Sequence, residues 1–180
     1  MAVLEFNYLT GDNAFMQEPL KQHSLALEEI IRETIGKEDS ISFSQFMQMA
    51  LYQPGFGYYS SGTHKFGEQG DFVTSPELGD LFAKCVAKQF QQILDQIETP
   101  IVLELGAGTG QFCFDCLLEL DRMNCLPEKY CILEVSADLQ QRQQTYIKQL
   151  LPELFHRVTW LSALPNESLN AIVIANEVFT

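Results

Sequence analysis

The chain has 180 residues, of which 46% are hydrophobic and 19% charged, so it can bury one sizeable core as an ordinary globular protein. Its net charge of −13, with only 11 lysines and arginines, argues against a nucleic-acid partner, because neutralising phosphates requires basic side chains. No apolar run reaches membrane-spanning length, and the N-terminus lacks both the pattern of a secretory signal and the arginines of a mitochondrial presequence.

Two amphipathic helices are predicted in the first third of the chain. The first begins at Ser24 and ends at Gly36, and its apolar stripe consists of Leu27, Ile30, Ile31 and Ile35. The second follows a capping box formed by Ser42 and Gln45, and Pro54 stops it.

A long loop rich in glycine, serine and aromatic residues follows, from Pro54 to Pro76. Loops of this length inside a compact domain are more often functional than passive. At its end, Ser75 is expected to cap a helix that starts with Pro76 and carries Leu78, Leu81, Phe82, Cys85, Val86, Ile93 and Leu94. The residues from Asp71 to Ser75 would then favour a carboxylate or phosphate at the helix N-terminus, unless Ser75 is only a cap.

From residue 101 onward, strands and helices alternate. Strands are predicted at 101–105, 130–135, 157–160 and 171–175, and helices near 109–120 and 137–150. Because the strands are almost continuously apolar, we expect an α/β fold with a parallel sheet covered on both faces. The predicted domains are a helical and loop cap segment at 1–76 and a Rossmann-like domain at 77–180.

A glycine-rich turn follows the first predicted strand. Gly106 and Gly108 fit the dinucleotide fingerprint, but its third position holds Gln111, and the third glycine comes one residue early, at Gly110. Glycines let the backbone turn tightly and approach a nucleotide-like ligand where a Cβ would clash. A nicotinamide-dependent oxidoreductase is therefore disfavoured, although a strand–helix turn of another doubly wound protein stays open.

Polar residues end two further strands. Glu134 lies at the end of the second strand, where a carboxylate can accept hydrogen bonds from both ribose hydroxyls of a nucleoside, or simply face solvent. Asn176 and Glu177 follow the fourth strand, at the edge of an α/β sheet where ligands bind. Asn176 can orient a ligand, and Glu177 can hold a cation or serve as a base, although a plain polar turn is an equal alternative.

The five cysteines show no disulfide-scaffold spacing. Cys113 and Cys116 have no second pair at ligand spacing, so we expect two core cysteines and no metal site. A reducing cytosol, that of a bacterium, is the expected location.

Several segments together resemble one family. They are SFSQFMQMALYQPGFGYY at 42–59, GEQGDFVTSPE at 67–77, LELGAGTG at 103–110, EVS at 134–136 and ANE at 175–177. In this order they resemble the MidA-like family of class I S-adenosylmethionine (SAM)-dependent methyltransferases. The mitochondrial members of that family are protein arginine methyltransferases that assist assembly of respiratory complex I.

The resemblance implies a Rossmann-like sheet that binds SAM and transfers its methyl group in line to a nucleophile on a protein substrate, for which the mitochondrial members suggest arginine. The cofactor-binding residues it implies are Gly70, Thr74, Ser75, Glu104, Gly106, Ala107, Gly108, Gly110, Glu134 and Asn176. Glu177 and Asp71 are the candidate catalytic carboxylates. The alternative is a SAM-binding scaffold or assembly factor without catalysis.

The resemblance also implies a sheet with three more strands beyond the fourth. We therefore expect the chain to be a fragment, truncated after its fourth strand. An unpaired fourth-strand edge is then a candidate surface for self-association.

Overall fold

The structure is a computed structural model that describes residues 17–61 and 74–178. The chain divides into two compact units, Met1–Gly57 and Tyr58–Thr180. Over the described ranges, no helix combines the length and apolarity needed to cross a membrane. The predicted domain boundary at residue 76 lies within the second unit and stays a prediction.

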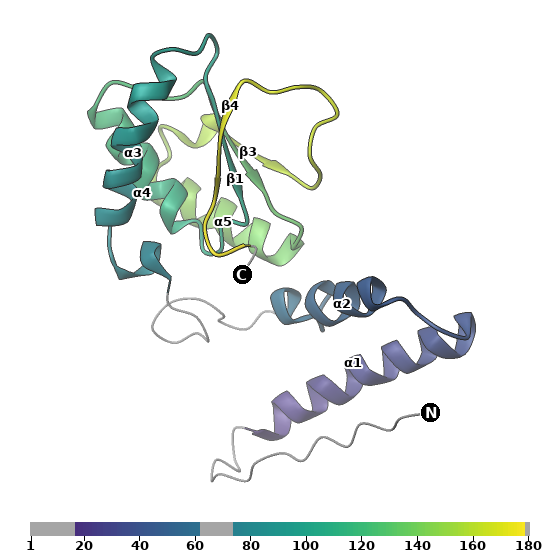
Figure 1. Ribbon diagram of the computed structural model, residues 1–180. Coiled ribbons are helices and arrows are strands. Elements are labelled where there is room, and N and C mark those ends of the chain that lie inside the picture. The colour runs from purple at the N-terminus through teal and green to yellow at the C-terminus, as the bar shows by residue number, and fades with distance from the viewer. Residues whose placement is uncertain (1–16, 62–73, 179–180) are drawn as a thin grey trace. The chain divides into compact units, whose positions relative to one another are not determined.

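The first unit contains two helices, α1 (Gln17–Glu38) and α2 (Phe43–Tyr52), which contact each other (Figure 1). Helix α1 begins seven residues before the predicted Ser24 (24 − 17). The capping box of α2 is confirmed, because the Ser42 hydroxyl accepts from the Gln45 amide at 3.1 Å and the Gln45 side chain accepts from the Ser42 amide at 2.8 Å.

A tight turn closes α2. The amides of Phe56 and Gly57 both donate to the Gln53 carbonyl, at 3.0 and 2.6 Å. Gly57 is buried, and a Cβ there would collide with the backbone of Tyr52 and Gln53. The turn therefore requires glycine at this position.

The second unit is built on a four-stranded parallel sheet in the order β3-β2-β1-β4. Its strands are β1 (Ile101–Leu105), β2 (Lys129–Leu133), β3 (Val158–Leu161) and β4 (Ala171–Ala175). Its helices are α3 (Leu81–Leu94), α4 (Gln111–Arg122) and α5 (Ala137–Leu150), with short 3₁₀ turns η1 (Tyr58–Ser60), η2 (Ser75–Leu78) and η3 (Phe155–Arg157). The predicted Rossmann-like α/β fold is thereby confirmed.

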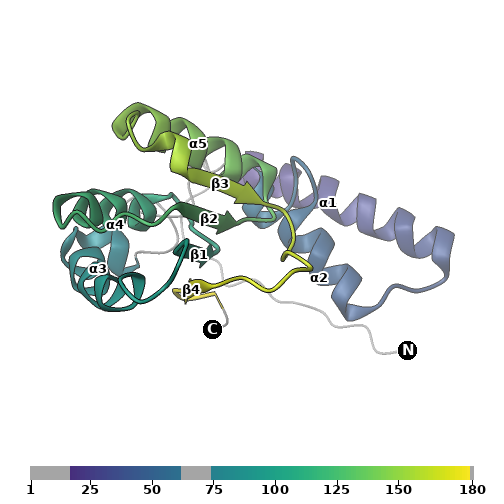
Figure 2. The ribbon, with the colours of Figure 1, turned by 90° about the horizontal axis from the view of Figure 1, so that it is seen from above.

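One core lies between the helices and the sheet. Helices α3 and α4 lie beside each other (Figure 2). The core cluster joins residues of α3, α4 and α5 with residues of all four strands. Strands β1, β2 and β3 follow one another across the sheet, so right-handed crossovers place α4 and α5 on the same face.

The sheet differs from the prediction on its other face. The connection from β3 to β4 contains no helix, and Val173 at the centre of β4 is 58% exposed. In the described part of the second unit, helices therefore cover one face of the sheet.

The predicted start of the third helix, at Pro76 with Ser75 as its cap, was wrong, because α3 begins at Leu81. Ser75 starts a 3₁₀ turn of four residues, whose N-cap Thr74 makes no side-chain capping bond. Gly79, with φ of 138°, then breaks the chain direction before α3 begins at Leu81. Because the turn and the helix are separate, Leu78 does not lie on the apolar stripe of α3 and is 78% exposed.

Candidate cofactor site at the strand ends

The sheet register brings three predicted site segments to one edge. Leu105, the last residue of β1, pairs with Leu133 at the end of β2 and with Ala175 at the end of β4. The glycine turn, Glu134 and Asn176 follow these three residues directly. Ligands of open parallel sheets bind beyond such strand ends.

The glycine turn has the geometry that its sequence predicts. Gly106, Gly108 and Gly110 all adopt positive φ, at 65°, 55° and 87°, in the region that side chains with a Cβ disfavour. The Gly106 amide donates to the Leu133 carbonyl at 3.0 Å, and the Gly110 amide donates to the Ala107 carbonyl at 2.8 Å. The Gly106 bond attaches the turn to the end of β2, and the buried Ala107 side chain attaches it to the core.

Two polar links hold the beginning of α4. Thr109 donates from its hydroxyl to the Glu77 carboxylate at 2.6 Å, and this bond joins the glycine turn to η2. Gln111, which departs from the dinucleotide fingerprint, donates to Asp115 at 2.7 Å and accepts from the Tyr146 hydroxyl of α5. Gln111 therefore connects α4 to α5.

Glu104 faces the helix-covered side of the sheet. Its carboxylate is buried and accepts a hydrogen bond from the Tyr130 hydroxyl at 2.8 Å. Burial raises the pKa of Glu104, the Tyr130 hydrogen bond lowers it and the charge of Glu134 raises it, and together they bring it to about 7. A carboxyl group with this pKa exchanges its proton near neutral pH.

Cys113 and Cys116 lie on the same side of the sheet as Glu104. Both thiols are buried, as expected for core cysteines, and burial raises the pKa of each thiol, with the Glu104 charge adding to the effect. Nowhere in residues 17–61 and 74–178 do three metal-binding side chains gather.

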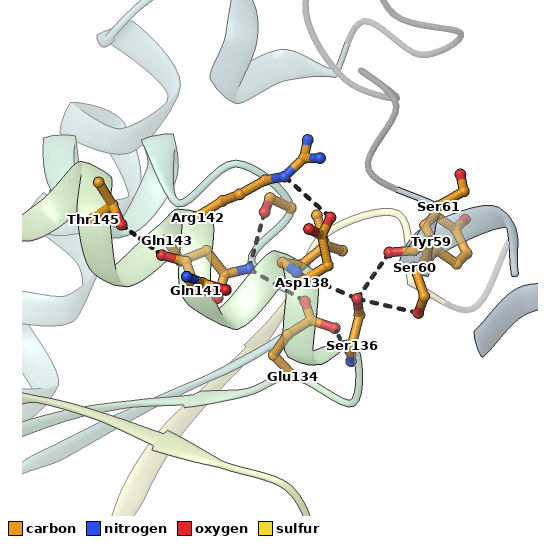
Figure 3. A network of polar contacts seen from close by, with 12 residues as sticks. Tyr59, Ser60, Ser61, Glu134, Ser136, Asp138, Gln141, Arg142, Gln143 and Thr145 are labelled. Atoms are coloured by element: carbon orange, nitrogen blue, oxygen red, sulfur yellow. Dashed lines mark hydrogen bonds and ion pairs between the residues drawn. The ribbon is translucent and has the colours of Figure 1, made fainter. Parts of the chain in front are cut away.

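Glu134 belongs to a connected set of polar side chains at the end of β2 (Figure 3). One carboxylate oxygen, Oε1, accepts from the Ser136 amide at 2.9 Å, and the other, Oε2, accepts from the Gln143 side-chain amide at 3.2 Å. The side chain is 5% exposed, so burial raises the pKa of Glu134 while these hydrogen bonds lower it. Hydrogen bonds to both of its oxygens thus fix the orientation of the Glu134 carboxylate.

Ser136 connects this set to the aromatic turn η1. Its hydroxyl donates to the Tyr59 carbonyl at 2.8 Å and accepts from the Leu139 amide at 3.3 Å, so it also caps α5 (Figure 3). The Ser60 hydroxyl lies 3.5 Å from the Ser136 hydroxyl. The turn η1 is therefore attached to the backbone that follows Glu134.

Asn176 and Glu177 leave β4 in an irregular turn. Asn176 is partly buried, whereas Glu177 is exposed and has a positive φ of 53°. Both lie at the same sheet edge as the glycine turn, because a Cβ on Gly106 would lie 3.3 Å from a Val178 methyl group. Among the other predicted site residues, Gly70 and Asp71 lie outside the described residues, while Thr74 and Ser75 form the start of η2, which Thr109 links to the glycine turn.

The parallel sheet and the glycine turn after β1 together define a class I methyltransferase-type fold. A profile of the family described as "Putative S-adenosyl-L-methionine-dependent methyltransferase" matches residues 82–180. The chain belongs to this MidA-like family of SAM-dependent methyltransferases.

Relatives and solved structures agree with this assignment. The mitochondrial protein arginine methyltransferase NDUFAF7 homolog of Drosophila melanogaster is 30% identical over 135 residues, which cover 71% of this chain and 31% of the relative. The Bos taurus protein arginine methyltransferase NDUFAF7 is 31% identical over 139 residues, covering 70% and 30%.

A crystal structure from Burkholderia thailandensis, bound to S-adenosyl-homocysteine, is similar with a TM-score of 0.76 at 40% identity. The similarity covers 87% of this chain and 42% of that one. The chain therefore spans less than half the length of the relatives and structures it matches.

Proposed function

We propose that the sheet edge formed by the glycine turn, Glu134 and Asn176 binds SAM. The register that brings these three segments together is the observation that carries the proposal. Three positive-φ glycines at alternate positions let the backbone of the turn approach the aminocarboxypropyl end of the cofactor. Glu134, fixed at the end of β2, presents a carboxylate suited to the two ribose hydroxyls.

The chain would contribute positioning and an acceptor carboxylate to methyl transfer. When bound, SAM supplies a methyl group on a sulfonium sulfur. Asn176 lies beside the glycine turn and orients ligands by hydrogen bonds, and exposed Glu177 holds a cationic side chain and accepts its proton. Asp71 is a second candidate for that proton, and Gly70, Thr74 and Ser75 would border the cofactor or substrate.

Arginine on a protein is the acceptor that we propose. The mitochondrial relatives carry the name of protein arginine methyltransferases, at about 30% identity. A net charge of −13 suits a cationic protein segment and not a nucleic acid. A bacterial cytosol is the proposed location, supported by five free cysteines and by similarity to a bacterial structure.

Calorimetric titration of the chain with S-adenosyl-homocysteine tests the site, with NADH as the control ligand. We expect S-adenosyl-homocysteine alone to bind, with micromolar affinity, which corresponds to about −8 kcal/mol. Binding of NADH in its place would overturn the assignment. Transfer of labelled methyl groups from SAM to an arginine-containing peptide, with the matched lysine peptide as control, tests the acceptor.

A further inference from the structure

We propose that Gln143 is a positioning residue for the ribose of the cofactor, which it serves by fixing the Glu134 carboxylate relative to the glycine turn. This inference rests on the proposed SAM site. Gln143 lies in the middle of α5, so only its side chain reaches the carboxyl ends of the strands.

The Gln143 side chain connects three elements of the site. It is 0% exposed, and its amide nitrogen Nε2 donates to the Gly108 carbonyl at 2.9 Å and to Glu134 Oε2 at 3.2 Å. Its oxygen Oε1 accepts from the Trp160 indole at 2.9 Å. A single amide group therefore ties the glycine turn, the end of β2 and β3 together.

Trp160 decides which way this amide points. An indole nitrogen only donates, so the Gln143 oxygen must face Trp160 and the NH₂ group must face Glu134 and Gly108. The reverse orientation would set an amide oxygen against the Gly108 carbonyl and the carboxylate, leaving buried groups unpaired. Gln143 thus has one favourable orientation, and in it both N–H groups point to the cofactor edge.

The donors to Glu134 reach both oxygens of its carboxylate. Ser136 bonds Oε1, Gln143 bonds Oε2, and the Val135 backbone also donates to the carboxylate. Because a carboxylate can accept about four hydrogen bonds, it keeps a position for a ribose hydroxyl. The stem of Gln143 also packs near Gly110, where a Cβ would lie 3.5 Å from Gln143 Cγ.

A merely structural role for Gln143 predicts a different result. A buried glutamine that only fills and satisfies the core would lower stability when replaced, and would weaken all ligands equally. A positioning role predicts a specific loss of discrimination for the ribose hydroxyls. The two roles are separated by comparing S-adenosyl-homocysteine with its 2′-deoxy analogue.

The test compares three variants of the chain by calorimetric titration with both ligands. Gln143→Met keeps the length of the side chain and removes its donors, Gln144→Met is the matched control on the exposed side of α5, and Glu134→Gln removes the carboxylate. Wild type and Gln144→Met should prefer the hydroxylated ligand about 10- to 100-fold, because hydrogen bonds to a charged group are strong. In Gln143→Met the preference should fall to about threefold or less, with the deoxy ligand bound as in wild type.

Each remaining outcome has a defined meaning. A Gln143→Met variant that keeps the wild-type preference overturns the positioning role alone. A wild-type chain that does not bind S-adenosyl-homocysteine, or a Glu134→Gln variant with unchanged preference, overturns the proposed site and this inference together. If circular dichroism shows that Gln143→Met does not fold, Trp160→Phe replaces it in the test. This variant removes the indole donor that orients the Gln143 amide, so it should reduce the preference for the hydroxylated ligand. An unchanged preference in Trp160→Phe overturns the inference.

Discussion

Replacing Glu104 with glutamine should make the chain more stable at alkaline pH. The Glu104 carboxyl is buried beneath the helices and bonded only to the Tyr130 hydroxyl among the hydrogen bonds described. Glutamine has nearly the same shape, keeps an oxygen that accepts from Tyr130, and stays uncharged at every pH. The substitution therefore removes the buried charge and replaces one carboxylate oxygen with an NH₂ group.

The size of the effect follows from the raised pKa of Glu104. A rise from 4.5 to about 7 corresponds to about 3 kcal/mol, because each pKa unit is about 1.4 kcal/mol. Below pH 4.5 both the folded and the unfolded chain carry the proton, so the wild type has its full stability. Between 4.5 and 7 the unfolded chain releases the proton first, and stability falls until the folded carboxyl also ionises.

Urea unfolding at several pH values measures this difference. The free energy of unfolding of Glu104→Gln minus that of wild type should grow by about 3 kcal/mol from pH 4.5 to pH 8. Glu98→Gln, at an exposed position, is the matched control and should show no such trend. A Glu104→Gln difference that stays constant to within about 0.5 kcal/mol would refute the reasoning.

Three further predictions concern the glycine turn and the sheet edge. Gly106→Leu should abolish S-adenosyl-homocysteine binding in calorimetry, because φ is 65° and a Cβ would press on Val178, whereas Gly36→Ala, in open space, should leave binding intact. Retained affinity in Gly106→Leu would show that the turn is assigned wrongly. Thr109→Val should lower the unfolding free energy by about 1 kcal/mol through loss of the bond to η2, and Thr145→Val, at an exposed hydroxyl, by less. If the β4 edge mediates self-association, Val173→Lys should shift sedimentation toward monomer, and a wild-type chain that is monomeric at all concentrations would disprove it.

The fold was predictable where the signal is local and repeated. The strands β1 and β4 begin and end at the predicted residues, because continuous apolar runs are bounded by turn residues and polar strand ends. Ser42 was identified as a cap because its partner Gln45 lies only three residues away. The error at Ser75 arose because Ser75 and Pro76 begin a 3₁₀ turn with Thr74 as its N-cap, and Gly79 ends this turn before a helix can grow.

The site was predictable only at residues with a recognisable spacing. The glycines and Glu134 were chosen from their positions after strands, and the register places them together, although their role toward SAM stays a prediction. Gln143 was missed because helix α5 contains five glutamines, and only packing shows which one is buried. The contact between Thr109 and Glu77 joins residues 32 apart, a separation that no local pattern encodes.

The central position of β1 has a consequence for how the chain folds. Ile101 pairs with Lys129, 28 residues later (129 − 101), and with Ala171, 70 residues later (171 − 101). Closing the longer loop costs more entropy, so the β1–β2 half should form first and the β4 pairing last. During synthesis on the ribosome, one edge of β1 therefore stays unpaired until β4 has emerged. In that interval the backbone hydrogen-bonding groups of this edge are free to pair with other chains.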